Sequence, residues 1–179
     1  DITARKQTEE ILKLTETRLE AMLHLSQQSY LSGADLARLV MEECVKLTRS
    51  DIGYIAFVNE DETELTMYAW SEKAMKICSV KDKPFIYRLE ETGLWGEAVR
   101  QRKAVITNDY DAPGQYKRGV PEGHVPVKRH MNAPIIDGDR IVIVAGVGNK
   151  LSDYDEADVR QLTLLMEGMW SIIKRSQAE

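Results

Sequence analysis

Apolar residues recur at helical spacing near the start of the chain. The segment 8–28 contains neither Gly nor Pro and is rich in residues of high helix propensity. Four residues at helical spacing mark one face of the predicted helix: Ile11, Arg18, Met22 and Leu25. Because Arg18 interrupts this apolar row, we expect an imperfect packing surface.

A second long helix is predicted at the other end of the chain. Asp153 and Glu156 have the spacing of an N-terminal capping box, and the helical pattern runs towards Arg175. The apolar positions alternate in steps of three and four, which is typical of a coiled coil: Val159, Leu162, Met166, Met169 and Ile173. A core helix packed on a sheet has the same pattern. We expect both, with the first half packed inward or on a partner and the tail continuing as a coiled coil.

Between these ends, a helix leads into a sheet. The segment 33–51 predicts an amphipathic helix with an apolar inner face. The runs 53–58 and 64–70, joined by a short acidic turn, predict an antiparallel hairpin. A short helix near 72–77 and an apolar segment at 85–89 follow.

The second half of the predicted sheet contains a strand, a long loop and a hairpin. A compact helix at 94–103 precedes a strand at 104–109, and residues 110–130 form a loop rich in Gly and Pro. The segment 131–150 predicts a hairpin that turns at Asp-Gly-Asp, 137–139. Because alternating strand–helix units are absent, we expect an α+β fold with a mostly antiparallel sheet.

Length and composition exclude several classes of protein. The 179 residues suffice for one domain and a linker. With 24 Lys and Arg against 29 Asp and Glu, the chain lacks the basic face that nucleic-acid binding requires. No apolar run approaches the roughly 20 residues of a membrane span. The two cysteines are too few for a disulfide framework, so we expect a reducing, cytoplasmic environment.

The sequence contains three informative segments: SDIGYIAFVNEDETELTMYAW, TGLWGEAVRQRKAVITNDY and MNAPIIDGDRIVIVAGVGNKLSDYDEADVRQLTLLMEGMW. Together they resemble the GAF domain, a sensory module found upstream of histidine kinases. The resemblance implies a six-stranded, mostly antiparallel sheet with helices on one face, a ligand pocket on the other and long terminal helices. The opening DITARKQTEE is similar to the tail of a PAS domain followed by a signalling helix. These two resemblances divide the chain into a linker helix at 1–30 that follows a PAS-type tail, a sensory domain at 31–172, and the start of a coiled-coil linker at 173–179.

The sequence favours a sensor over an enzyme. It contains no GxGxxG, Walker, GxSxG or HExxH motif. In a sensor, a ligand would shift the terminal helices of a homodimer, and a kinase domain further along the same chain would respond. The alternative is a ligand-free module that only pairs two subunits.

Candidate residues for the pocket come from the resemblance and from residue chemistry. GAF domains that carry bilins commonly have His directly after the chromophore cysteine, whereas Ser79 follows Cys78. The free methionine sulfoxide reductase branch relies on several closely arranged cysteines, and Cys44 is a poor partner for Cys78.

GAF domains hold cyclic nucleotides, bilins, haem, small metabolites or no ligand. Haem is the cofactor expected from the residues of this chain, and otherwise the ligand is an unknown small molecule. Some haem-holding GAF domains use one cysteine and one histidine, which implies a thioether at Cys78 and an axial iron ligand at His124. His130, Trp95 and Tyr110 are further candidate cofactor-binding residues. An aromatic surround of Trp70, Phe85, Tyr87 and Trp95 suits a porphyrin.

Each candidate also has a purely structural interpretation. A loop histidine such as His124 is more often a solvent-facing residue than a metal ligand. His130 is expected to hydrogen-bond the loop, while Arg129 pairs with Asp109 or Asp111. Cys44 and the three tryptophans are expected in the core.

Overall fold

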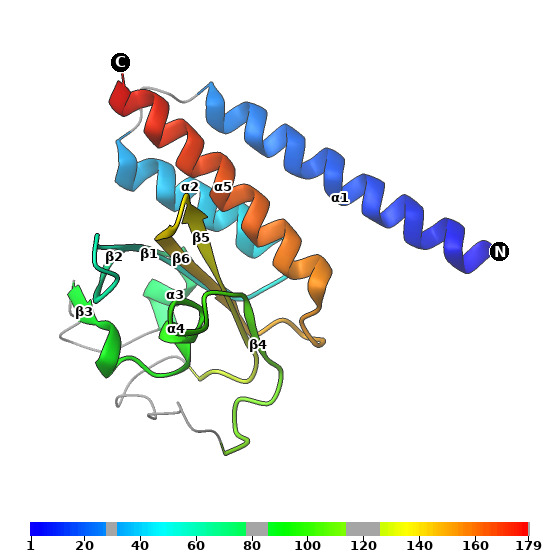
Figure 1. The fold of residues 1–179 in the computed structure, drawn as a ribbon. Helices are drawn as coiled ribbons and strands as arrows, with labels where there is room; N and C mark the ends of the chain where they lie inside the picture. Colours follow the sequence, from blue (N-terminus) through cyan, green and yellow to red (C-terminus); the bar gives the residue numbers. More distant parts are fainter. Residues whose placement is uncertain (28–31, 78–85, 114–125, 179) are drawn as a thin grey trace.

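Six antiparallel strands form one sheet, in the order β3-β2-β1-β6-β5-β4. The computed structural model describes residues 1–27, 32–77, 86–113 and 126–178 (Figure 1). The strands are β1 (Ile52–Val58), β2 (Glu64–Trp70), β3 (Ile86–Arg88), β4 (Val105–Thr107), β5 (His130–Asp137) and β6 (Arg140–Gly148). This arrangement confirms the expected α+β fold. The expected hairpin turn is also present, with Gly138 at a φ of 66°.

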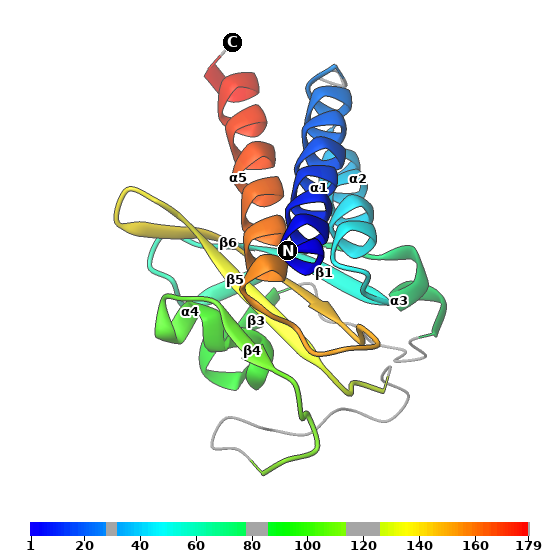
Figure 2. The ribbon, with the colours of Figure 1, turned by 90° about the vertical axis from the view of Figure 1, so that its right-hand side faces the viewer.

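Three long helices cover one face of the sheet. They are α1 (Ile2–Ser26), α2 (Gly33–Leu47) and α5 (Glu156–Ala178), and Figure 2 shows them together above the strands. Two short α-helices are α3 (Glu72–Ile77), beside the sheet, and α4 (Glu97–Gln101), on the side away from the long helices. Two 3-10 helices, η1 (Leu89–Glu91) and η2 (Leu94–Gly96), precede α4. The two faces of the sheet therefore have different coverings.

Both predicted terminal helices are present, but α5 is capped at a residue other than the one predicted. Helix α1 spans Ile2–Ser26, within the linker helix expected at 1–30, and the Asp1 carboxylate accepts a hydrogen bond from the Thr3 amide. Helix α5 is capped by Asp155, whose carboxylate accepts from the amide of Asp158, while the Asp158 carboxylate accepts from the Asp155 amide. The predicted capping box was therefore placed two residues too early.

The predicted coiled-coil row of α5 packs inside the domain. Leu162, Met166 and Met169 are fully buried against the sheet and the other helices, and Val159 and Ile173 pack against the same core. Of the two interpretations of this pattern, the core helix holds for these residues.

Helices α1 and α5 run side by side in the same direction (Figures 1 and 2). Arg18, which interrupts the apolar row of α1, donates a 3.0 Å hydrogen bond to Gln161 of α5. Met22 packs over Gly168, where an added Cβ would lie 2.1 Å from the Met22 methyl carbon. The first half of α1 is exposed and extends past the domain. The first and last helices of the chain are therefore in direct contact.

Adjacent leucines on α5 provide a test of this packing. Leu165 is fully buried and Leu164 is 36% exposed. Replacing Leu165 with Ala should lower the free energy of unfolding by about 2–5 kcal/mol, because it leaves a cavity in the core. The control Leu164→Ala should cost less than about 1 kcal/mol. Urea denaturation measures both, and equal losses would contradict the described orientation of α5.

Candidate functional site

The sheet face turned away from the long helices carries a buried cluster of polar and aromatic side chains. Tyr54 reaches it from β1, and His130 and Asn132 reach it from β5, where side chains two residues apart share a face. Gly146 of β6 pairs with both Tyr54 and Asn132. A Cβ at Gly146 would lie 2.4 Å from the Tyr54 ring, so the glycine leaves room for that ring to reach across β6.

His130 is buried as a neutral ring. Its side chain is 7% exposed, and its Nε2 atom lies 3.1 Å from the Tyr54 hydroxyl. The two rings stack with centroids 5.9 Å apart and an interplanar angle of 11°. Burial lowers the pKa of His130 to about 4, because the charged form would lose its hydration. The imidazole is therefore uncharged near neutral pH.

Asn132 has its amide orientation set by two backbone carbonyls. The side chain is fully buried, and its nitrogen donates to the carbonyls of Trp95 at 2.8 Å and Leu94 at 3.3 Å. Both amide hydrogens are used in these bonds. The Asn132 Oδ1 atom is left as a hydrogen-bond acceptor only.

The Tyr54 hydroxyl contacts both the Trp95 carbonyl, at 3.3 Å, and His130 Nε2, at 3.1 Å. Burial raises the pKa of Tyr54 far above its ordinary value, and a hydrogen bond with Asn132 opposes this only in part, so the hydroxyl stays protonated and has one hydrogen to donate. When that hydrogen goes to the Trp95 carbonyl, the Tyr54 oxygen accepts from His130 Nε2–H, and this tautomer has a lone pair on Nδ1. When it goes to Nε2, the ring hydrogen of His130 is on Nδ1 instead.

Two buried side-chain atoms have no partner among the described residues: His130 Nδ1 and Asn132 Oδ1. An unpaired buried polar atom costs about 1–3 kcal/mol. Such atoms are uncommon in folded proteins and are usually satisfied by water or by a ligand. This pair, which we name the acceptor pair, is the strongest indication of a binding site on this face.

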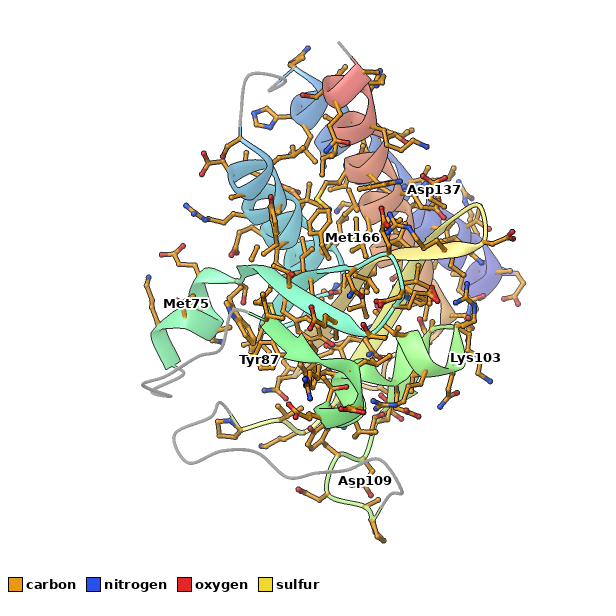
Figure 3. All side chains as sticks on the ribbon, turned by 60° about the vertical axis from the view of Figure 1, so that its left-hand side comes forward. Met75, Tyr87, Lys103, Asp109, Asp137 and Met166 are labelled. Atoms are coloured by element: carbon orange, nitrogen blue, oxygen red, sulfur yellow. The ribbon has the colours of Figure 1, made fainter. Side chains whose placement is uncertain are left out.

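Aromatic rings surround the polar centre. Trp95 meets Tyr54 edge-on with centroids 5.8 Å apart, and Tyr87 meets Trp95 edge-on at 4.8 Å. Trp70 lies 6.1 Å from Tyr54. Tyr87 belongs to the side of the sheet opposite Met166, as Figure 3 shows. These rings supply a flat, apolar surround for a bound molecule.

A buried ion pair holds the backbone that Asn132 and Tyr54 contact. Arg100 pairs with Glu97, which is 1% exposed, and donates to the carbonyls of Leu89 and Gly93. These bonds clamp the segment that contains Trp95. The carbonyl positions that orient the polar side chains are therefore rigid.

The structure brings together three of the five predicted cofactor-binding residues. His130 is central, Trp95 contributes its carbonyl and ring, and Tyr110 lies edge-on to His130 at 6.4 Å. Cys78 and His124 lie outside the described residues. Their predicted roles as haem attachment and iron ligand remain predictions.

The expected loop contacts of Arg129 and His130 were wrong. Arg129 pairs with Asp153 at 3.1 Å, rather than with Asp109 or Asp111, because the end of β6 brings the Asp153 loop beside it. His130 bonds Tyr54 instead of the loop, because its position as the first residue of β5 turns it onto the sheet face.

Sequence reasoning missed Tyr54 and Asn132. Both stand in strands whose alternate positions were predictable, which is the signal that could have identified them. Cys44 is buried on the helix side, as expected, and burial raises the pKa of its thiol. Trp70, Trp95 and Trp170 are only partly buried, at the edges of the two apolar clusters.

A cleft of about 470 Å³ lies on the helix side, between α1, the end of α2 and the start of α5. Its lining mixes cations and anions, and Lys150 is already paired with Asp158 at 2.7 Å. Because no buried polar group without a partner lines this cleft among the described residues, it offers weaker support for a ligand than the acceptor pair.

Neither a metal cluster nor a membrane span is found in the described part of the chain. Over residues 1–27, 32–77, 86–113 and 126–178, no three His, Cys, Asp or Glu side chains gather as metal ligands. None of the helices in these ranges is long and apolar enough to cross a membrane.

Comparison with known proteins identifies relatives in sequence and in structure. The family model for the GAF domain matches residues 31–174. The methyl sulfide methyltransferase-associated sensor of Methanosarcina acetivorans is 53% identical over 179 residues, which is all of this chain and 18% of that protein. The chain therefore spans well under two thirds of this relative.

Solved structures show the same fold at low sequence identity. The GAF domain of a phosphoenolpyruvate-protein phosphotransferase from Coxiella burnetii superposes with a TM-score of 0.71 at 13% identity, covering 91% of this chain and 96% of that one. Free methionine-R-sulfoxide reductase from Neisseria meningitidis superposes with a TM-score of 0.66 at 13% identity, covering 90% of each chain. At this identity the likeness concerns the fold alone.

Burial of His130 predicts a pH-dependent stability. The unfolded chain binds a proton near pH 6.5 and the folded chain only near pH 4, so stability is present above about pH 6.5 and is lost as the pH falls towards 4. We expect His130 to account for a loss of about 2 kcal/mol between pH 7 and pH 5. The loss should disappear in His130→Phe and persist in His24→Phe, an exposed control. Denaturation at both pH values measures it, and an unchanged slope in His130→Phe would refute the assignment.

Proposed function

The chain belongs to the GAF domain family, and on this basis we propose that it is the signal-input domain of a sensor histidine kinase. A small ligand or haem binds on the aromatic sheet face, and the terminal helices pass the change to a kinase domain of the longer protein. The 53% identical relative is named a methyl sulfide methyltransferase-associated sensor, which supports a sensory role of the same kind.

The acceptor pair is the observation that carries this proposal. A module that only paired subunits would have no need to bury His130 Nδ1 and Asn132 Oδ1 without partners among the described residues. Filling this face with apolar side chains would be more stable. The unpaired atoms favour an occupant.

Strand β5 offers a direct route from this face to the last helix. His130 is its first residue and Asp137 its last. The Asp137 carboxylate accepts from the Trp170 indole at 2.8 Å and from Lys174 at 3.0 Å, both on α5. These two hydrogen bonds lower the pKa of Asp137. A displacement of β5 would therefore reach α5 through charge-assisted contacts.

A second route joins the end of β6 to the start of α5. Lys150, two residues after β6, pairs with Asp158 in the first turn of the helix at 2.7 Å. The Tyr154 hydroxyl accepts from the Lys150 amide and bonds Ser50 at 2.7 Å. For either route to signal, the ligand must bind one arrangement of the helices more tightly than the other.

Haem is the cofactor we propose for this face. The described residues fit a porphyrin in kind, because the surround is aromatic and a neutral histidine lies at its centre. Cys78 would hold the haem by adding its thiol across a vinyl group, and His124 would be the axial ligand. Bound haem would supply an iron whose oxidation state, axial ligation or bound gas changes.

The alternative function is a ligand-free dimerisation module. Its support is a row of exposed leucines on the side of α1 that faces away from the domain, spaced seven and four residues apart: Leu12, Leu19 and Leu23. We name this row the outer stripe. A sensor dimer would use the same surface, so the two functions differ in the ligand and not in the pairing.

Haemin addition followed by dithionite tests the cofactor. We expect a sharp Soret band that moves on reduction, because the iron would be held by a protein ligand. His124→Ala should abolish or shift the band, while His24→Ala, on the exposed side of α1, should not. Cys78→Ala should make the haem extractable by acidic organic solvent. A featureless spectrum with haemin present would rule out haem and favour another ligand or the dimerisation module.

The outer stripe predicts a homodimer. Leu19 is 61% exposed, and its replacement by Glu should convert a dimer into a monomer, because like charges would meet across the helix pair. The control is Leu151→Glu, which changes a 97% exposed leucine in a loop and should leave the dimer intact. Light scattering after size exclusion measures the mass. A monomeric parent, or a dimer unaffected by Leu19→Glu, would refute pairing through the outer stripe.

A further inference from the structure

We infer that the acceptor pair recognises a ligand group that donates two hydrogen bonds, as a primary amide does, and that it rejects carboxylates and phosphates. This inference rests on the proposed sensory function in its small-ligand form. It specifies a ligand other than haem, because the ring nitrogens of haem are bound to iron and its propionates are carboxylates. It concerns His130 Nδ1 and Asn132 Oδ1, which the fold places two residues apart on the same side of β5.

With Tyr54 donating to the Trp95 carbonyl, as we infer, both atoms can only accept, because every hydrogen of the two side chains is already used. The two amide hydrogens of Asn132 go to the Leu94 and Trp95 carbonyls. The single ring hydrogen of His130 goes to Tyr54, whose own hydrogen goes to the Trp95 carbonyl. The Arg100–Glu97 ion pair clamps that carbonyl segment. A bound molecule must therefore supply the hydrogens itself.

Charge and shape narrow the class of ligand. A carboxylate or phosphate would bring more lone pairs against two acceptors, which is repulsive. The hydrogen-bond partners of Tyr54, His130 and Asn132 within the described chain include no carboxylate, so an ammonium group would be buried without a counter-ion. The flanking rings of Tyr54 and Trp95 suit a planar group. A neutral, flat amide is the chemistry that remains.

Benzamide and benzoate form a matched pair of probes. They have nearly the same shape, but only benzamide carries an NH₂ group. We expect the 179-residue chain to bind benzamide at least tenfold more tightly than benzoate in calorimetric titrations at pH 7. His130→Phe keeps an aromatic ring and removes the Nδ1 acceptor, and it should weaken benzamide binding by about tenfold. His24→Phe is the control that should change nothing.

Nitrogen-15 NMR of the parent chain gives a readout that needs no variant. The free protein should show His130 as the Nε2–H form, and benzamide should shift the Nδ1 resonance as that atom gains a hydrogen bond. An Nδ1–H form would overturn the inference. So would equal binding of both probes, no binding of either because a water already occupies the site, or benzamide binding that leaves the His130 resonances unmoved.

The outcomes separate this inference from the proposed function. A haemin Soret band, or helix-mediated dimerisation, with no preference for benzamide would overturn the acceptor-pair inference and leave the sensory proposal standing. A benzamide preference with a featureless haemin spectrum would support the inference and contradict haem as the cofactor.

Discussion

Side chains alternate between the two faces of a strand, and this constraint gives the sheet one apolar face and one face with polar and aromatic side chains. On β5, Met131 and Ala133 enter the core under the long helices, while His130 and Asn132 enter the opposite cluster. A shift of one residue in register would exchange the two sets and bury the polar pair against apolar helices. The pairing of β5 with β6 and β4 therefore decides both the core and the candidate site.

The polar cluster contains buried, unpaired polar atoms that lower the stability of the folded protein. Burial keeps His130 neutral, and the carbonyls that orient Asn132 belong to a segment clamped by Arg100 and Glu97. A folded protein with no use for such atoms gains by pairing them or replacing them with apolar groups. The unpaired polar atoms lie on one face of the sheet, away from the apolar core under the long helices. Sites of this kind are where proteins commonly give up stability for function.

The same strand that carries the polar pair ends against α5. Asp137 is held by Trp170 and Lys174, so β5 and α5 contact each other at the hairpin tip as well as through the core. Close contact between α1 and α5 at Gly168 ties the entering helix to the leaving one. In the proposed function, binding and output would therefore share strand β5 and its contacts with α5, and this proximity suits a relay that depends on small displacements.

Local patterns in the sequence determined most of the secondary structure, including the terminal helices, both hairpins and the Asp-Gly-Asp turn. The sequence also contains the segments that resemble a GAF domain. Periodicity and turn chemistry act over a few residues, so they are readable without a fold. Only the tertiary structure decided that the heptad-like row of α5 is core, that Asp155 rather than Asp153 caps that helix, and that Tyr54 and Asn132 join His130. These outcomes depend on which distant segments meet. A hydrogen bond between two residues 76 positions apart produces no periodic pattern in the sequence.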